Sequence, residues 1–303
     1  MSRTVGPLLF VLFINDIDQI IDNDSDCKLY ADDLKLYSNY SNNNCVATTQ
    51  LLLDKLYAWS VKWQLSINYS KCRVLHLGHV NSKADYYINN VKIISERTVN
   101  DLGVLTDSYL KFNVHINSIC AKAHARVSLL FRGFLSRDYY LLVTAYKVYV
   151  LPLLEYCSVV WSPWQIGLIN ALENVQRYFT RKLVWPNIMP YAERLALLDL
   201  ELLEVRRLKA DMYFCFKILN NLTALDKNIY FTTDIRNIST RNYDNSLLMY
   251  NRSSCNRSDN LFFNRCVAVW NSLSFECRNA ASLTVFKDFI EMHDFTNFLK
   301  GRA

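Results

Sequence analysis

Two adjacent carboxylates, Asp32 and Asp33, are the residues of this sequence whose chemistry is easiest to interpret. They follow Leu29-Tyr30-Ala31 and precede the alternating run Leu34 to Tyr37, a pattern that predicts two short strands about a turn at Asp32-Asp33. Carboxylates exposed by such a turn can hold Mg²⁺, which prefers oxygen ligands and keeps waters and phosphates as its other ligands. Aspartates also favour turns for backbone reasons, and the pair alone fits a structural turn better than a metal site.

The rest of the first third of the chain is expected to mix strands and helices. Pro7 to Ile17 predicts a buried helix opened by Gly6-Pro7, because proline is tolerated in a first helical turn. Its apolar run, Leu8 to Ile14, is shorter than the roughly 20 residues that span a bilayer, so we assign it to the core and expect no membrane partner. A second helix is predicted by the apolar stripe Leu52, Leu56, Trp59 and Trp63, and further strands by Arg73 to Leu77 and Tyr86 to Ile94.

From about residue 110 the apolar residues recur at helical spacing. Three stripes, which begin at Phe112, Ile169 and Val205, predict a helical bundle. Basic residues off these stripes predict positively charged outer faces: Lys122, Arg126, Arg177, Arg181, Lys182, Arg206, Arg207 and Lys209. Residues 220–260 are polar with weak periodicity, which indicates a linker or long loop, and a compact segment is expected from Leu261 to Leu299.

Composition and charge narrow the class of protein. Glycine and proline are scarce, at 6 and 5 residues, which favours a helix-rich fold over a β-sandwich. The 9 cysteines show no paired spacing, so we interpret them as buried thiols in a reducing intracellular compartment, the nucleus or the cytoplasm. Residues 1–110 carry a net charge of −2 and residues 111–220 a net charge of +6. This distribution suits a metal site beside a polyanion-binding surface, and ordinary fluctuation would also produce it.

An ordered set of motifs gives the acidic pair its context. The motifs are Gly6-Pro7-Leu8-Leu9-Phe10 and Ile14-Asn15-Asp16 upstream, then Trp63-Gln64-Leu65-Ser66-Ile67-Asn68, Lys71-Cys72 and Leu102-Gly103-Val104 downstream. In this order and spacing they resemble the reverse transcriptases of non-LTR (LINE-type) retrotransposons, especially the jockey-like group. The resemblance continues through Leu151-Pro152-Leu153-Leu154-Glu155-Tyr156 and Trp270-Asn271-Ser272-Leu273, so it covers nearly the whole chain.

This resemblance implies an α+β fold. Residues 1–110 would form a partial reverse-transcriptase palm, a small antiparallel sheet with helices. Residues 111–220 would form a mainly α-helical, thumb-like domain. An Asn-rich linker or loop over residues 221–260 and a C-terminal segment over residues 261–303 would follow.

The resemblance also implies roles for individual residues. Asp32 would be the main ligand of Mg²⁺, or of Mn²⁺ in its place, with Asp33 as its companion. Lys71 could approach the triphosphate or protonate pyrophosphate, and a solvated surface lysine is an equal alternative. The positions near the primer or nucleotide would be Tyr30, Ala31, Gly6, Pro7, Leu102 and Gly103. Phosphates of an RNA template and DNA primer would contact Lys122, Arg126, Arg177, Arg181 and Lys182, unless these are solvated helix faces.

Some parts of the family's polymerase are not found in this sequence. They are the fingers and an earlier palm strand that carries another metal-binding aspartate. Because positioning and electrostatics supply nearly all of the catalysis in phosphoryl transfer, we expect little or no polymerase activity from this chain alone. The basic helices suggest an alternative, a non-catalytic nucleic-acid-binding protein derived from the element. A third reading is a relic that exposes apolar surface where lost strands would pack.

Overall fold

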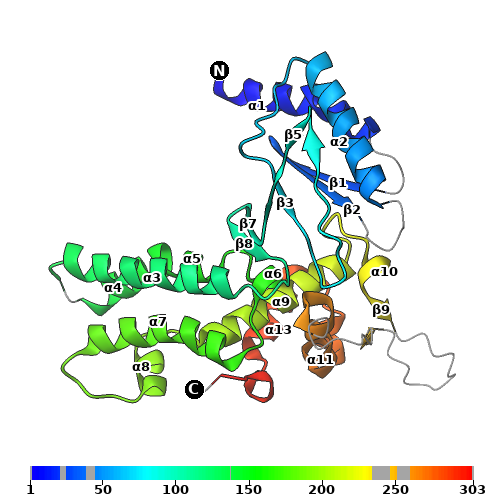
Figure 1. The fold of residues 1–303 in the computed structure, drawn as a ribbon. Helices are drawn as coiled ribbons and strands as arrows, with labels where there is room; N and C mark the ends of the chain where they lie inside the picture. The colour runs from blue at the N-terminus through cyan, green and yellow to red at the C-terminus, as the bar shows by residue number, and fades with distance from the viewer. Residues whose placement is uncertain are drawn as a thin grey trace, which may run out of the picture. The chain divides into compact units, whose positions relative to one another are not determined.

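The computed structural model describes residues 2–20, 25–38, 45–136, 138–233, 246–250 and 260–301. The chain divides into Met1–Leu110 and Lys111–Ala303, which we call unit 1 and unit 2 (Figure 1). Helices and small sheets occur together, which confirms the expected α+β class. In the described part of the chain, no helix combines the length and the apolar character that crossing a bilayer requires.

Unit 1 alternates helices with short strands. Its helices are α1 (Ser2–Phe13), the 3-10 helix η1 (Asn15–Ile20) and α2 (Cys45–Lys62). Its strands are β1 (Ser25–Tyr30), β2 (Asp33–Ser38), β3 (Arg73–Leu75), β4 (Tyr87–Ile88), β5 (Val91–Lys92), β6 (Ile94–Glu96), β7 (Thr98–Asp101) and β8 (Val104–Asp107). The described strands of unit 1 pair two by two, with hairpins β1–β2, β4–β5 and β7–β8.

The prediction of an antiparallel sheet in unit 1 is wrong for one pair of strands. Strand β3 pairs with β6 in parallel, with Arg73 opposite Ile94. A parallel pair needs a long connection that returns the chain in the same direction, and residues 76–93, which contain the β4–β5 hairpin, make it. Strand propensity locates β3, but the return path of the chain decides the direction of its partner.

Helix α1 differs from its prediction in both extent and burial. It begins at Ser2, so Pro7 lies inside the helix instead of opening it. Leu12 is 64% exposed, and other apolar residues of the helix are similarly exposed. Side chains of α1 find packing partners at its C-terminal end, where the Phe13 ring packs edge-on against Trp63 with ring centroids 5.2 Å apart. An apolar run favours burial, but tertiary contacts decide how much of it is covered.

The core of unit 1 lies between α2 and the β4–β5 hairpin. Leu53, Ile88 and Ile93 are buried together in this core. The side-chain amide of Gln50 on α2 donates to the carbonyl of Tyr87 at 2.8 Å and accepts from its N–H at 3.0 Å. This paired hydrogen bond fixes β4 against one turn of α2.

Unit 2 is mainly helical (Figure 1). Its longer helices are α3 (Asn113–Gly133), α4 (Tyr139–Tyr149), α7 (Ile166–Val184), α8 (Tyr191–Leu197), α9 (Leu203–Leu219), α11 (Phe262–Ser272) and α13 (Leu283–Met292). Shorter elements connect them: α5 (Leu151–Glu155), α6 (Ser158–Trp161), α10 (Lys227–Tyr230), β9 (Thr232–Thr233), β10 (Leu248–Met249), α12 (Phe275–Arg278) and η3 (Thr296–Phe298).

The apolar stripes predicted for α3 and α7 are confirmed. Ile116, Ala123 and Val127 on α3 are fully buried, as are Val175 and Phe179 on α7. A second core joins α9 to α11 and α13, where Phe216, Trp270 and Phe286 pack together. Residues after 261 therefore share a core with α9. Of the predicted linker, residues 234–245 and 251–259 lie outside the described residues.

Two basic residues predicted for an outer face are buried instead. Arg207 and Lys209 on α9 are 3% and 5% exposed. The Lys209 ammonium pairs with Glu201 at 2.5 Å and also with Glu291 on α13. A buried charge needs such partners, and these carboxylates come from other segments of the chain. Helical periodicity alone could not reveal them.

Candidate active site and nucleic-acid interface

The acidic pair lies at the tip of the β1–β2 hairpin, as the sequence predicts. The strands are antiparallel, and Tyr30 pairs with Asp33 at the end of the ladder. The turn is therefore Ala31-Asp32, one residue earlier than predicted, with Ala31 in the left-handed region at φ 52°. Asp32 lies in the turn and Asp33 begins β2, and both carboxylates are exposed.

The alternation of the hairpin explains why its carboxylates face solvent. Residues that pair across two strands place their side chains on the same face, so Tyr30 and Asp33 share one face. Leu34 and Leu36 lie on the opposite face, and Leu36 packs against the core of unit 1. Packing of Leu36 against the core therefore directs the opposite face, which carries Asp33, away from that core.

A second hairpin is tied to this acidic hairpin. Strands β7 and β8 are joined by Leu102 and Gly103, both with positive φ, at 46° and 89°. Asp101, the residue before this turn, forms an ion pair with Lys35 of β2. Lys35 lies two residues after Asp33 and so on the same face. The structure thus brings the Leu102-Gly103 turn and the acidic hairpin together.

Three other predicted site residues, Lys71, Gly6 and Pro7, have no contact with the hairpin tip among the contacts of the described residues. Lys71 is exposed in a turn, where its N–H donates to the carbonyl of Asn68 at 3.0 Å. Arg73 holds this turn by donating to the carbonyl of Ser70 at 2.6 Å. Gly6 and Pro7 lie inside α1, and a Cβ added at Gly6 would meet no atom within 4 Å.

The hairpin has the oxygen donors that a magnesium ion prefers. Asp32 and Asp33 supply adjacent, accessible carboxylates, a donor set that fits a hard cation. Among the residues that the structure describes, no group of three or more His, Cys, Asp or Glu side chains is arranged to hold a metal. The hairpin therefore fits one part of a metal site.

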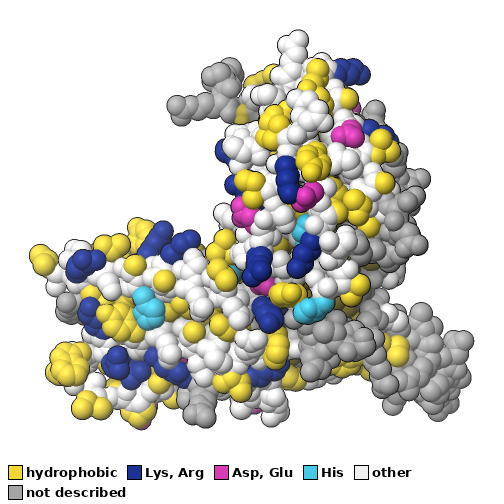
Figure 2. Space-filling view, in the orientation of Figure 1, with side chains coloured by type: hydrophobic (Ala, Val, Ile, Leu, Met, Phe, Trp, Pro, Cys, Tyr) yellow, Lys and Arg dark blue, Asp and Glu magenta, His cyan; other side chains and the backbone are white. Residues whose placement is uncertain are grey.

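The basic residues predicted to bind phosphates in unit 2 fall into two sets. Lys122 and Arg126 lie on the outer side of α3, where Arg126 donates to the carbonyl of Tyr149 at 3.2 Å. Arg177, Arg181 and Lys182 lie on α7. Figure 2 shows Lys and Arg side chains over these helices, with a row along α7 and α8.

The structure adds a residue that the sequence did not indicate. Arg194 on α8 lies beside Tyr191, with its guanidinium 5.3 Å from the ring centroid, and Arg177 lies 4.9 Å from the same ring. Burial lowers the pKa of Arg194, and the nearby charges of Arg181 and Arg177 lower it further. Arg194 follows Tyr191 by three residues on a short helix, a spacing too common to have been a signal.

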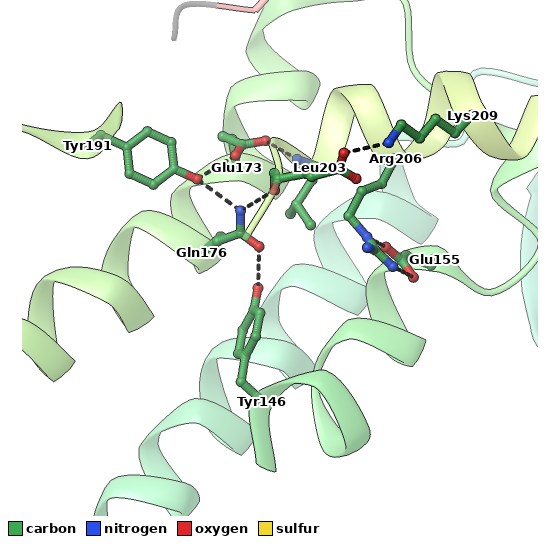
Figure 3. Close-up of polar contacts among 9 residues, drawn as sticks. Tyr146, Glu155, Glu173, Gln176, Tyr191, Leu203, Arg206 and Lys209 are labelled. Carbon is green, nitrogen blue, oxygen red and sulfur yellow. Dashed lines mark hydrogen bonds and ion pairs between the residues drawn. The ribbon is translucent and has the colours of Figure 1, made fainter. Parts of the chain in front are cut away.

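A buried polar network fixes the helices that carry these arginines (Figure 3). Gln176 on α7 accepts from the Tyr146 hydroxyl and donates to the Tyr191 hydroxyl, both at 3.2 Å. The Tyr191 hydroxyl in turn donates to Glu173 at 2.5 Å. Glu173 also accepts from the N–H of Leu203 at 3.0 Å. Burial raises the pKa of both Tyr191 and Glu173, so the network links α4, α7, α8 and α9 in a poorly solvated interior.

Comparison with known proteins assigns the first third of the chain to a family. The model of the family "Reverse transcriptase (RNA-dependent DNA polymerase)" matches residues 3–106, which include both hairpins described above. The chain therefore contains a reverse-transcriptase region, residues 3–106. It is 26% identical over 198 residues to the RNA-directed DNA polymerase from mobile element jockey of Drosophila funebris. This match covers 60% of the chain and supports the jockey-like, non-LTR group that the motifs indicated.

A second relative is an uncharacterized protein of Caenorhabditis elegans. It is 34% identical over 91 residues, which are 30% of this chain and 46% of the relative. The match to the jockey polymerase covers 21% of that protein. The chain thus spans about a fifth of the length of the jockey polymerase and somewhat under half of the length of the Caenorhabditis elegans protein. No solved structure matches it.

Proposed function

We propose that this chain supplies part of the active site and of the nucleic-acid-binding surface of an RNA-directed DNA polymerase from a non-LTR retrotransposon. In this proposal it works inside the cell, in the nucleus or cytoplasm, on an RNA template and a DNA primer. Residues 1–110 act as a partial palm and residues 111–220 as a thumb-like region, followed by a C-terminal segment. The observation that carries the proposal is the hairpin tip with two exposed, adjacent carboxylates, Asp32 and Asp33.

The hairpin suits nucleotidyl transfer. Asp32 would hold Mg²⁺ (or Mn²⁺) and Asp33 would assist, and the bound metal supplies activation of the primer 3′-hydroxyl and stabilisation of the leaving pyrophosphate. Tyr30 and Ala31, next to the carboxylates, would border the primer end. The Leu102-Gly103 turn, held near β2 through Asp101, would contact the primer strand.

We also propose that the chain has little or no polymerase activity by itself. Phosphoryl transfer depends almost entirely on precise positioning and on electrostatic stabilisation of the transferred group. A single hairpin offers two carboxylates from neighbouring residues, which leave the metals poorly fixed. A further aspartate from another polypeptide segment would complete the site.

Primer extension tests the catalytic proposal. A longer polypeptide that joins this chain to a segment with fingers and another palm aspartate should extend a DNA primer on RNA, and only with Mg²⁺ or Mn²⁺. Asp32→Asn should abolish extension, whereas Asp85→Asn, a control at an exposed carboxylate of unit 1, should leave it unchanged. Undiminished extension by the Asp32→Asn variant, or extension without metal, would show that the hairpin is not the metal site.

A second function, non-catalytic nucleic-acid binding, is favoured by the net charge of +6 over residues 111–220. Lys122, Arg126, Arg177, Arg181 and Lys182 would contact phosphates and position the nucleic acid without reading its sequence. Binding of this chain to an RNA–DNA hybrid should weaken steeply as salt rises, because phosphate contacts release counterions. Binding should persist in an Asp32→Asn/Asp33→Asn variant without metal. Absent or salt-independent binding would exclude this function.

A further inference from the structure

A concentration of positive charge surrounds Tyr191 between α7 and α8. Arg177 and Arg194 flank its ring, and Arg181 is close enough to lower the pKa of Arg194. Glu173, a carboxylate whose pKa is raised by burial and lowered in part by the charge of Arg177, accepts hydrogen bonds from the Tyr191 hydroxyl and from a backbone N–H at the start of α9. Within the described residues, neither Arg181 nor Arg194 forms an ion pair. Arg181 and Arg194 therefore have positive charge available to an anionic ligand.

Arg194 is held in place for such a ligand. Its Nε donates to the hydroxyl of Thr180 at 3.1 Å, and its Nη1 donates to the carbonyl of Met189 at 2.6 Å. The guanidinium has five N–H donors, so these two bonds orient it and leave donors on Nη2. A planar guanidinium with a fixed orientation matches the oxygen atoms of a phosphate better than a mobile lysine does.

An exposed aromatic ring lies beside this cluster. Trp185 caps the C-terminus of α7, one helical turn beyond Arg181, and is 74% exposed. Residues four apart on a helix lie on the same side, so Trp185 follows α7 on the side that carries Arg181. At 74% exposure the indole is accessible to another planar group that could stack on it.

We propose that Arg181, Arg194 and Trp185 form a binding site for an unpaired nucleotide segment. The two guanidinium groups bind backbone phosphates, and the indole stacks on one base. A duplex or hybrid buries its base faces in its own stack, so only a single-stranded segment offers a base face to Trp185. The site deepens the proposed nucleic-acid role of unit 2 and rests on it. It adds a preference for single strands, to which Arg194 and Trp185 contribute.

Binding of a labelled oligothymidylate and of a labelled RNA–DNA hybrid, measured by fluorescence anisotropy over a salt series, tests the site. Trp185→Ala should weaken oligothymidylate binding about tenfold at every salt concentration and leave hybrid binding unchanged. Arg181→Gln and Arg194→Gln should each lower the salt slope for oligothymidylate by about 0.7, the value for one phosphate contact on a single strand. Trp185→Tyr, which keeps an aromatic face, should retain most of the binding.

Two controls match these substitutions. Lys287→Gln removes one exposed charge on α13, and Phe275→Ala removes one exposed aromatic ring on α12; neither should change oligothymidylate binding. Equal weakening of hybrid and oligothymidylate by Trp185→Ala would overturn the site but not the proposed nucleic-acid role. Failure to bind either nucleic acid would overturn both. The site would also be overturned if Trp185→Ala weakened binding to phosphatidylserine vesicles but not to oligothymidylate, because the surface would then be a membrane-binding one.

Discussion

Replacing Arg265 by methionine removes the partner that neutralises a buried carboxylate in unit 2. Arg265 on α11 donates through Nε and Nη2 to the two carboxylate oxygens of Asp211 on α9, both at 2.8 Å. The side chain of Asp211 is 2% exposed, and that of Arg265 is 15% exposed. Burial raises the pKa of Asp211. Its ionised form is therefore costly unless Arg265 compensates the charge.

The expected loss is large because a buried charge would be left without its partner. Arg265→Met should lower the free energy of unfolding of unit 2 by about 3–5 kcal/mol. For a unit of this size, each kcal/mol lowers Tm by about 2–4 °C, so Tm should fall by roughly 6–20 °C. Asp211→Leu should cost less, because Arg265 is more exposed and still donates to the carbonyl of Val159 at 2.6 Å. The double variant should be more stable than Arg265→Met, since no unpaired carboxylate remains.

The loss should also depend on pH in a predictable direction. In Arg265→Met the folded-state pKa of Asp211 lies still further above its unfolded value, because burial is then opposed only by the charge of Arg207. A raised pKa means that the ionised carboxylate destabilises the folded state at neutral pH, and that this destabilisation disappears as protonation proceeds at lower pH. The difference in Tm between the wild type and the variant should therefore shrink as the pH falls from 7 toward 4.

Urea unfolding followed by near-ultraviolet circular dichroism measures these differences, with calorimetry for Tm. Lys147→Gln is the matched control: its ion pair with Asp199 spans 3.5 Å, and Asp199 is fully exposed, so we expect no resolvable change. A loss below about 1 kcal/mol in Arg265→Met would refute the reasoning. Strict additivity of the two single substitutions in the double variant would do the same, because it would show that the two groups do not interact.

Gly103→Ala should destabilise unit 1 by about 1 kcal/mol in urea unfolding, because Gly103 has φ +89°, whereas Gly6→Ala, at an open helical position, should stabilise it slightly. Glu291→Gln should lower Tm at pH 7 but not well below pH 4.5. Hydrogen bonding from Lys209 lowers the pKa of Glu291, and the stability that this interaction provides is lost as the carboxylate is protonated. Glu173→Ala should cost about 2 kcal/mol, since it leaves the first N–H of α9 and the Tyr191 hydroxyl without their acceptor, and tryptic cleavage in α8 should become faster.

The sequence by itself determined the features that depend on neighbouring residues. The helical spacing of Ile116, Ala123 and Val127 identified the buried side of α3, because residues three and four apart share a helix face whatever else surrounds them. The hairpin at Tyr30-Ala31-Asp32-Asp33 followed from two alternating runs about a turn, although the turn proved to be one residue earlier. The ordered motifs indicated a jockey-like reverse transcriptase, and the comparisons confirmed this resemblance, with the family match over residues 3–106.

Only the tertiary structure decided which charges and apolar faces find partners. Lys209 and Arg207 have the spacing of solvent-facing residues, yet both are buried. Lys209 forms ion pairs with Glu201 and Glu291, which lie outside α9, and Arg207 lies in the field of several carboxylates, of which Glu173 acts most strongly on its pKa. The apolar face of α1 favours a core position but is largely exposed. Helix α8 brings Arg194 beside Arg177 and Arg181 through the folding of a loop that no local pattern specifies. Burial and electrostatic partnership are properties of contacts between distant segments, and local periodicity carries no information about those contacts.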